Sequence, residues 1–168
     1  WRNQGTGTVD YIKVASYDGQ ASTHNLVIAP GADALAAGQI YSLRTVAVNA
    51  FGSGEASEEL TVGVANFPAA PASLSKVAAE SGTTYLTLEW PVSADTDLPV
   101  AGYELWVKAD AVGGGTYEIA YNGTNYPNVR KFTMAAGLET GMSYTIVVKA
   151  VTFNGAGAPS TPVKPTIC

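Results

Sequence analysis

The sequence predicts an all-β protein built from antiparallel sheets. Short segments alternate apolar and polar side chains, which is the pattern of a half-buried strand. Turn residues such as Gly, Asn and Asp separate these segments at intervals of about 8–12 residues, which is typical of sandwiches. The sequence also repeats itself after about 100 residues, the spacing of tandem sandwich domains rather than of a solenoid. We therefore predict two antiparallel β-sandwiches in tandem.

The clearest predicted strand covers residues 84–90, where Leu86, Leu88 and Trp90 share one face. Four other segments alternate in the same way or are rich in β-branched residues: 11–14, 25–28, 103–108 and 144–150. The Ala-rich stretch 31–39 is the single helical candidate. Because it is short and bounded by Gly and Pro, we interpret it as a loop with room for one helical turn.

The internal repeat is clearest around two tyrosines. The segment that begins at Tyr41 lies over the one that begins at Tyr144, and Tyr, Ala, Val, two Gly and Ser coincide at a constant offset. Leu35 precedes Tyr41 by six residues, as Leu138 precedes Tyr144. Two prolines interrupt a run of small residues between the repeats, and we place the boundary there, giving domains at 1–66 and 67–168.

In the second repeat, Leu86-Thr-Leu-Glu-Trp90-Pro91 is followed by Leu138-Glu-Thr-Gly-Met-Ser-Tyr144. Together these motifs resemble the fibronectin type III family. The resemblance implies a buried Trp90 and a tyrosine corner, in which the hydroxyl of Tyr144 bonds to upstream backbone while its ring fills the core. Leu138 belongs to this corner, and Tyr41 and Leu35 are its counterparts in the first repeat.

The first repeat departs from this pattern. Trp1 falls opposite Trp106, or one residue from it, so nothing answers Leu74, Leu86 or Leu88. We therefore expect 1–66 to be a partial fibronectin type III-like domain that lacks the first two strands and most of the third, and 67–168 to be complete. Three explanations remain open: an excerpt of a longer array, which we favour, strands supplied by another molecule, or proteolysis.

Composition argues against several functions. The formal net charge is −5 and the nine basic residues are scattered, which disfavours nucleic acid as a partner. One histidine, His24, and one cysteine, Cys168, exclude a disulfide framework and a zinc site. No apolar run is long enough for a membrane span. The low content of Lys and Glu favours an extracellular or cell-surface location.

No catalytic constellation is visible, so we predict no enzyme and no cofactor. His24 has no nucleophile at a recognisable spacing, and Glu89 and Glu104 lie on outward strand faces. The acidic residues Asp95 and Asp97, with Glu139 or Asp110 nearby, have the oxygen ligands that Ca²⁺ prefers. They lack the spacing of a known calcium loop, and we interpret them as solvated, so we predict no metal.

Two surface features are candidate sites. Asn122 begins an Asn-Gly-Thr acceptor for glycosylation, with a turn that needs Asn-Gly for positive φ as the alternative. By alternation six apolar residues point away from the cores and could form a contact patch for a neighbouring subunit or a sugar ring: Trp1, Trp106, Val46, Val48, Val147 and Val151. The alternative is a tryptophan covered by lysine stems, those of Lys108 and Lys149.

We expect a non-catalytic structural or adhesive repeat region of a large extracellular or cell-surface protein, such as a subunit of a fibre or filament. The alternatives are a spacer in a secreted polysaccharide-degrading enzyme and a receptor ectodomain. The expected partners are neighbouring repeats or copies of the chain itself, and other surface proteins or glycans.

Overall fold

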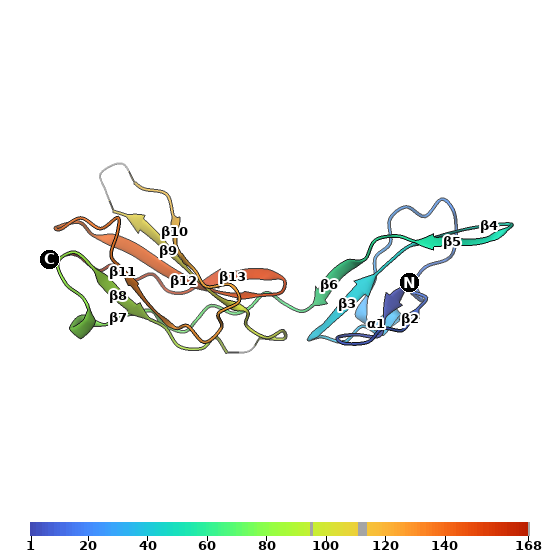
Figure 1. Cartoon of the computed structure of the whole chain (residues 1–168), viewed down its shortest axis with the longest axis horizontal. Coiled ribbons are helices and arrows are strands. Elements are labelled where there is room, and N and C mark those ends of the chain that lie inside the picture. Colours follow the sequence, from blue (N-terminus) through green and yellow to red (C-terminus); the bar gives the residue numbers. More distant parts are fainter. Residues whose placement is uncertain (95, 111–113, 168) are drawn as a thin grey trace. The chain divides into compact units, whose positions relative to one another are not determined.

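A computed structural model describes residues 1–94, 96–110 and 114–167 (Figure 1). The chain separates into two compact units, Trp1–Ala65 (unit 1) and Asn66–Cys168 (unit 2). Every described strand pair is antiparallel, and the helical elements are one turn, α1 (Pro30–Asp33), and one 3₁₀ turn, η1 (Ala78–Glu80). The all-β fold class is confirmed, and the Ala-rich stretch is a loop that includes most of α1.

Unit 2 consists of two sheets. The three-stranded sheet has the order β11-β8-β7, formed by β7 (Ser75–Lys76), β8 (Leu86–Glu89) and β11 (Lys131–Met134). The four-stranded sheet has the order β10-β9-β12-β13, formed by β9 (Gly102–Ala109), β10 (Glu118–Asn122), β12 (Tyr144–Thr152) and β13 (Gly155–Pro159). The strands predicted at 84–90, 103–108 and 144–150 are β8, β9 and β12.

The core of unit 2 lies between these sheets. Leu86 and Leu88 of β8 and Ile146 of β12 have no solvent-exposed surface. Trp90 is 4 % exposed, and its ring lies 5.9 Å from that of Tyr103. Alternate residues of each strand therefore fill one core, as the period of two predicts.

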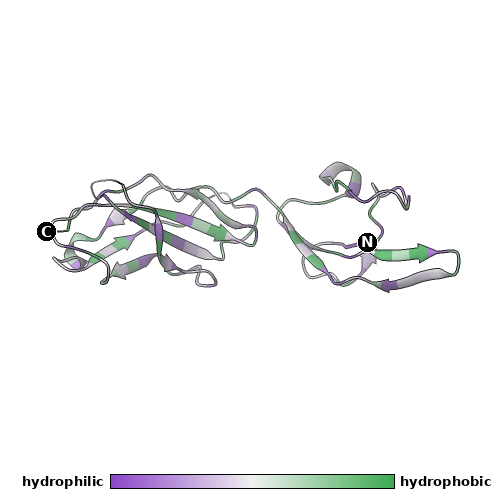
Figure 2. Ribbon diagram, turned by 90° about the horizontal axis from the view of Figure 1, so that it is seen from above, coloured by the Kyte–Doolittle hydropathy of each residue, from purple (hydrophilic) through white to green (hydrophobic). Residues whose placement is uncertain are grey.

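Unit 1 has one four-stranded sheet and a hairpin. The sheet has the order β2-β1-β3-β6, formed by β1 (Arg2–Asn3), β2 (Tyr11–Ile12), β3 (Gln39–Leu43) and β6 (Leu60–Val64). The hairpin joins β4 (Val46–Asn49) to β5 (Gly52–Ala56). Figure 2 shows hydrophobic strand residues in both units. The segment predicted at 11–14 is a strand only at its first two residues.

The strand predicted at 25–28 is absent from the described residues of unit 1, and that prediction is wrong. In unit 2 the strand that precedes the tyrosine corner is β11, and it pairs with β8. Unit 1 contains no described counterpart of β8. Because a strand needs a hydrogen-bonded neighbour, the apolar, β-branched residues at 25–28 do not form a strand.

Both units form a tyrosine corner. The hydroxyl of Tyr144 accepts from the backbone N–H of Glu139 at 2.8 Å and donates to the carbonyl of Gly137 at 3.3 Å. The hydroxyl of Tyr41 accepts from the N–H of Ala36 at 2.8 Å. Both rings are buried. Each hydrogen bond ties the tyrosine to the loop that precedes its strand, which is β12 for Tyr144 and β3 for Tyr41.

A buried carboxylate organises the long loop of unit 1. Asp33 is 2 % exposed and accepts from the backbone N–H groups of Ser16, at 2.8 Å, and Ala29, at 3.0 Å. These hydrogen bonds, that of Ser16 first, hold the pKa of Asp33 below its usual value. The guanidinium of the buried Arg2 donates to the carbonyl of Asp33, so β1 and the end of α1 are joined.

Candidate functional site

Neighbouring side chains contact Trp106, the centre of the predicted patch in unit 2. The indole N–H donates to the carboxylate of Glu104 at 2.9 Å, and the ammonium of Lys149 lies 4.5 Å from the ring centroid. Val147 and Val151 are only 5 % and 6 % exposed. The expectation that these valines offer an exposed apolar surface is therefore wrong. Long side chains on the outer face of the sheet cover the smaller ones beside them.

Trp1 occupies the same place in unit 1. The amino group of Trp1 donates a hydrogen bond to the carbonyl of Arg44 at 2.9 Å, and the N–H of Arg44 donates to the carbonyl of Trp1 at 3.0 Å. Trp106 pairs with Val147 at the matching position of unit 2. Trp1 is 46 % exposed and Val48 is 72 % exposed, so these two residues of the predicted patch offer substantial apolar surface.

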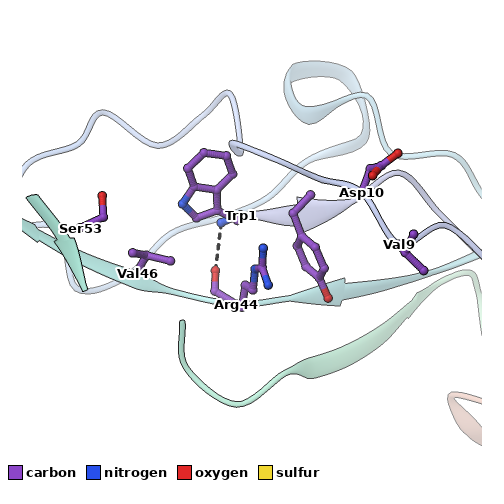
Figure 3. A pocket seen from close by; sticks show the side chains of 7 residues that line it. Trp1, Val9, Asp10, Arg44, Val46 and Ser53 are labelled. Atoms are coloured by element: carbon purple, nitrogen blue, oxygen red, sulfur yellow. Dashed lines mark hydrogen bonds between the residues drawn. The ribbon is translucent and has the colours of Figure 1, made fainter. Parts of the chain in front are cut away.

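An open pocket of about 500 Å³ lies beside Trp1 (Figure 3). The guanidinium of Arg44 lies 3.7 Å from the ring centroid of Tyr11, and the hydroxyl of Tyr11 donates to Glu59. That hydrogen bond raises the pKa of Tyr11. The other lining residues are Val9, Asp10, Val46 and Ser53. The pocket combines the aromatic rings of Trp1 and Tyr11 with charged groups. The guanidinium of Arg44, however, already covers the ring of Tyr11.

A second open pocket of about 570 Å³ lies in unit 2. It is lined by Ser73, Ser75, Glu89, Trp90, Pro91, Asn128, Arg130 and Lys131. The buried indole N–H of Trp90 has no hydrogen-bond partner among the described residues. The hydroxyl of Ser75 in this lining donates to the backbone carbonyl of Glu89 at 3.5 Å.

Two of the acidic residues considered as calcium ligands, Asp97 and Asp110, form hydrogen bonds with other residues of the chain. Asp97 accepts from the backbone and side-chain nitrogens of Asn66, at 3.0 and 3.2 Å, and Asp110 accepts from the hydroxyl of Thr145 at 2.6 Å. Within the described part of the chain, no three acidic, His or Cys side chains gather as a metal site would require. Asp95 and Cys168 lie outside the described residues, and His24 is exposed.

The acceptor Asn122 is exposed at the end of β10. Its side-chain oxygen accepts from the N–H of Thr124 at 3.0 Å. The positive φ in this turn belongs to Asn125, at 74°, rather than to Asn122 or Gly123. The alternative explanation, that Asn-Gly is present to supply positive φ, is therefore wrong.

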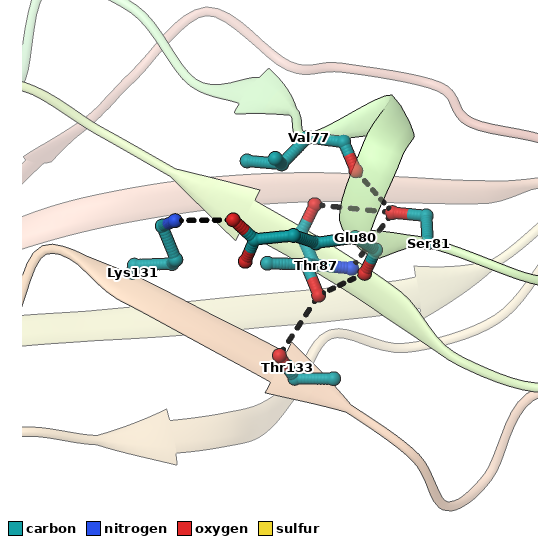
Figure 4. Close-up of polar contacts among 6 residues, drawn as sticks. All are labelled: Val77, Glu80, Ser81, Thr87, Lys131 and Thr133. Carbon is teal, nitrogen blue, oxygen red and sulfur yellow. Dashed lines mark hydrogen bonds and ion pairs between the residues drawn. The ribbon is translucent and has the colours of Figure 1, made fainter.

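A polar network that the sequence analysis missed covers the outer face of the three-stranded sheet (Figure 4). Thr87 is 1 % exposed; its hydroxyl contacts that of Thr133 at 2.8 Å and donates to the carbonyl of Glu80. Its backbone N–H donates to the hydroxyl of Ser81 at 3.0 Å. The hydroxyl of Ser81 therefore takes the place of a backbone carbonyl on a neighbouring strand, at a point where the chain has left β7. The network links segments distant in sequence, and no local pattern signals it.

Comparisons with known proteins agree with this geometry. The family model described as "Fibronectin type III domain" matches residues 69–166. A solved FNIII domain from a human protein is 17 % identical, with 61 % of this chain and 80 % of that chain covered and a TM-score of 0.52. The FN1–FN3 domains of chicken CNTN1 are 18 % identical, with 79 % and 42 % covered and a TM-score of 0.52.

The kinase region of twitchin from C. elegans is also similar. It is 18 % identical, with 61 % of this chain and 17 % of that chain covered and a TM-score of 0.50. No match was found among curated proteins. At these identities the solved structures show the fold alone. In the part of the chain that the structure describes, no helix is long and apolar enough to cross a membrane.

Proposed function

The chain belongs to the fibronectin type III domain family, and we propose from this that it is a non-catalytic, structural or adhesive repeat region of a large extracellular or cell-surface protein. Modules of this family are generally structural and adhesive units. In this proposal the chain spaces neighbouring repeats and carries load between them. Copies of the chain and other surface proteins or glycans are its further partners.

The observation that carries this proposal is the central ladder of unit 2. Strands β9 and β12 pair over eight residues, from Gly102↔Val151 to Ala109↔Tyr144. On the other edge, Val163 forms a bridge to Ile146 of β12, and Thr166 forms a bridge to Ser143, the residue just before β12. Force applied along the chain therefore has to break an antiparallel ladder as well as open an apolar core.

Single-molecule pulling of the full chain between inert handles tests this function. Unit 2 holds residues 66–168, whose fully extended length is about 340–370 Å, so its rupture should release that length less the span of the folded unit, in one cooperative step. Gly102→Ala is the matched variant, because a Cβ there would lie 1.9 Å from the carbonyl oxygen of Gly123. It should lower the rupture force. Smooth extension of the unmodified chain, without a rupture, would contradict a load-bearing role.

We also propose that Asn122 is glycosylated when the chain passes through a eukaryotic secretory pathway. The support is the exposed side chain and the Asn-Gly-Thr sequence. Expression in a secreting cell should add a glycan mass that a glycosidase removes. Thr124→Ala is the control, and an unmodified mass in the parent chain would refute the assignment. The spacer and receptor alternatives are supported by no specific contact among the described residues.

A further inference from the structure

The two units differ at one position beside their matching tryptophans. An offset of 103 residues between the two tyrosine corners places Val46 of unit 1 at the position of Lys149 in unit 2. Strand pairing keeps this offset, because Val46 pairs with Ala56 and Lys149 pairs with Pro159. In unit 2 the ammonium of Lys149 lies 4.5 Å from the ring centroid of Trp106. The position of that lysine is therefore held by a valine in unit 1.

The indole of Trp1 is left open by this exchange. Trp1 is 46 % exposed, whereas Trp106 is half-buried. Trp1 and Val46 both line the pocket of about 500 Å³ (Figure 3), which lies within the range of about 300–1,000 Å³ of small-molecule sites. The face of an indole is flat and apolar, so the C–H groups of a sugar ring can pack on it. The pocket therefore has an apolar wall of the right size for a sugar.

Beside this wall the pocket holds a cation without a counter-ion. The guanidinium of Arg44 stacks on the ring of Tyr11 but forms no ion pair with a described acidic residue, and its buried Nε has no acceptor among the described residues. The nearby carboxylate of Glu59 accepts from the hydroxyl of Tyr11. Asp10 and Ser53 also line the pocket, and both are exposed. The lining thus offers an unpaired guanidinium, a carboxylate and a hydroxyl.

We propose that this pocket binds a sugar ring that carries a carboxylate, the class to which uronates belong. The apolar face of the ring packs on Trp1 and Val46. The carboxylate accepts from Arg44, whose N–H groups form a fork that matches a carboxylate, and the ring hydroxyls donate to Asp10. Each group of the lining then meets a complementary group of the ligand. The inference rests on the proposed surface-repeat function and names the class of glycan and the site that contacts it.

Titration of the full chain with a short oligogalacturonate tests the proposal, with an uncharged oligogalactose of the same length as the control ligand. Calorimetry measures the affinity, and the NMR signal of the indole N–H of Trp1 locates the site. We expect the uronate to bind at least about tenfold more tightly than the neutral oligomer, because the pair of Arg44 with a carboxylate adds charge-assisted hydrogen bonds. The signal of Trp1 should shift as the uronate binds.

Val46→Lys separates a built site from general attraction to positive charge. It places in unit 1 the lysine that lies over Trp106 in unit 2. A lysine over the indole competes with the sugar, so the affinity should fall about threefold or more although the variant gains a positive charge. Phe51→Ala is the matched control, because it removes an aromatic ring of unit 1 that is 99 % exposed and outside the pocket lining. Its affinity should be unchanged.

A second variant and a fold control keep the test independent of Val46. Arg44→Gln should abolish the preference for the uronate over the neutral oligomer, since the carboxylate loses its cation. An unchanged amide signal of Tyr41, which is buried in unit 1, shows that each variant has kept its fold.

Four outcomes overturn the proposal. Equal affinity for the charged and the neutral oligomer, or binding of neither, excludes a carboxylated sugar as the ligand. Equal or tighter binding by Val46→Lys shows that the uronate is attracted by charge and is not held on the indole. Tighter binding of an oligoaspartate peptide than of the uronate assigns the pocket to an acidic protein segment. The pulling experiment reads unit 2 alone, so the two proposals fail independently.

Discussion

Removing one hydroxyl from the tyrosine corner of unit 2 should measure what that corner contributes. Tyr144→Phe keeps the buried ring but leaves the N–H of Glu139 without the acceptor that now lies 2.8 Å away. A part-buried donor that loses its partner costs about 1–3 kcal/mol, whereas the 3.3 Å bond to Gly137 adds little. We expect the free energy of unfolding of unit 2 to fall by about 1.5 kcal/mol.

The assay is urea unfolding of the full chain followed by tryptophan fluorescence. A Trp1→Phe background leaves only Trp90 and Trp106, which both belong to unit 2. With a urea dependence of about 1.5 kcal/mol per M, the midpoint should fall by about 1 M. Tyr126→Phe is the matched control, because its ring is 64 % exposed. Equal midpoints for Tyr144→Phe and Tyr126→Phe would refute the reasoning.

Three further predictions concern burial, backbone approach and pH. Leu86→Ala removes a side chain with no exposed surface and should cost unit 2 about 2–5 kcal/mol in urea unfolding; a loss below about 1 kcal/mol would show that the core collapses around the cavity. Gly102→Ala places a Cβ 1.9 Å from the carbonyl oxygen of Gly123, so the thermal midpoint of unit 2 should fall clearly, and an unchanged midpoint would contradict the close approach. The N–H of Ser16 holds the pKa of Asp33 below its usual value, so this carboxylate stabilises unit 1 above pH about 4 and the contribution disappears as the pH falls further. Calorimetry between pH 5 and pH 2.5 should show unit 1 losing stability, and Asp33→Asn should flatten that dependence; identical pH profiles would exclude the carboxylate as the cause.

Alternation predicted the strands of unit 2 because each has one face in the core. It located β8, β9 and β12 within two residues of their ends. The same pattern failed at Val147 and Val151, because a period of two identifies the outward face and says nothing of what covers it. On that face Lys149 lies over the ring of Trp106, and these two residues belong to different strands. Side-chain coverage depends on register between strands, which a single sequence does not contain.

The hydrogen-bond network around Thr87 could not be predicted from local sequence patterns. The network around Thr87 joins residues from η1, β8 and β11, with Glu80 and Lys131 51 positions apart, and its hydroxyls carry no sequence signature. The acceptor at Asn122 was visible because three consecutive residues define it. Sequence analysis therefore found the features that a few neighbouring residues specify, and it missed those that the assembled sheets create.

The same distinction explains why unit 1 keeps a tyrosine corner although its described residues contain no counterparts of β7 and β8. The hydrogen bond from Ala36 to Tyr41 spans five residues, so it needs only the local chain. In unit 2, Val148 and Ala150 are buried in a core that includes Leu86 and Leu88 of another strand, whereas Thr45 and Ala47 of unit 1 are exposed. Local motifs can thus repeat faithfully while the core does not.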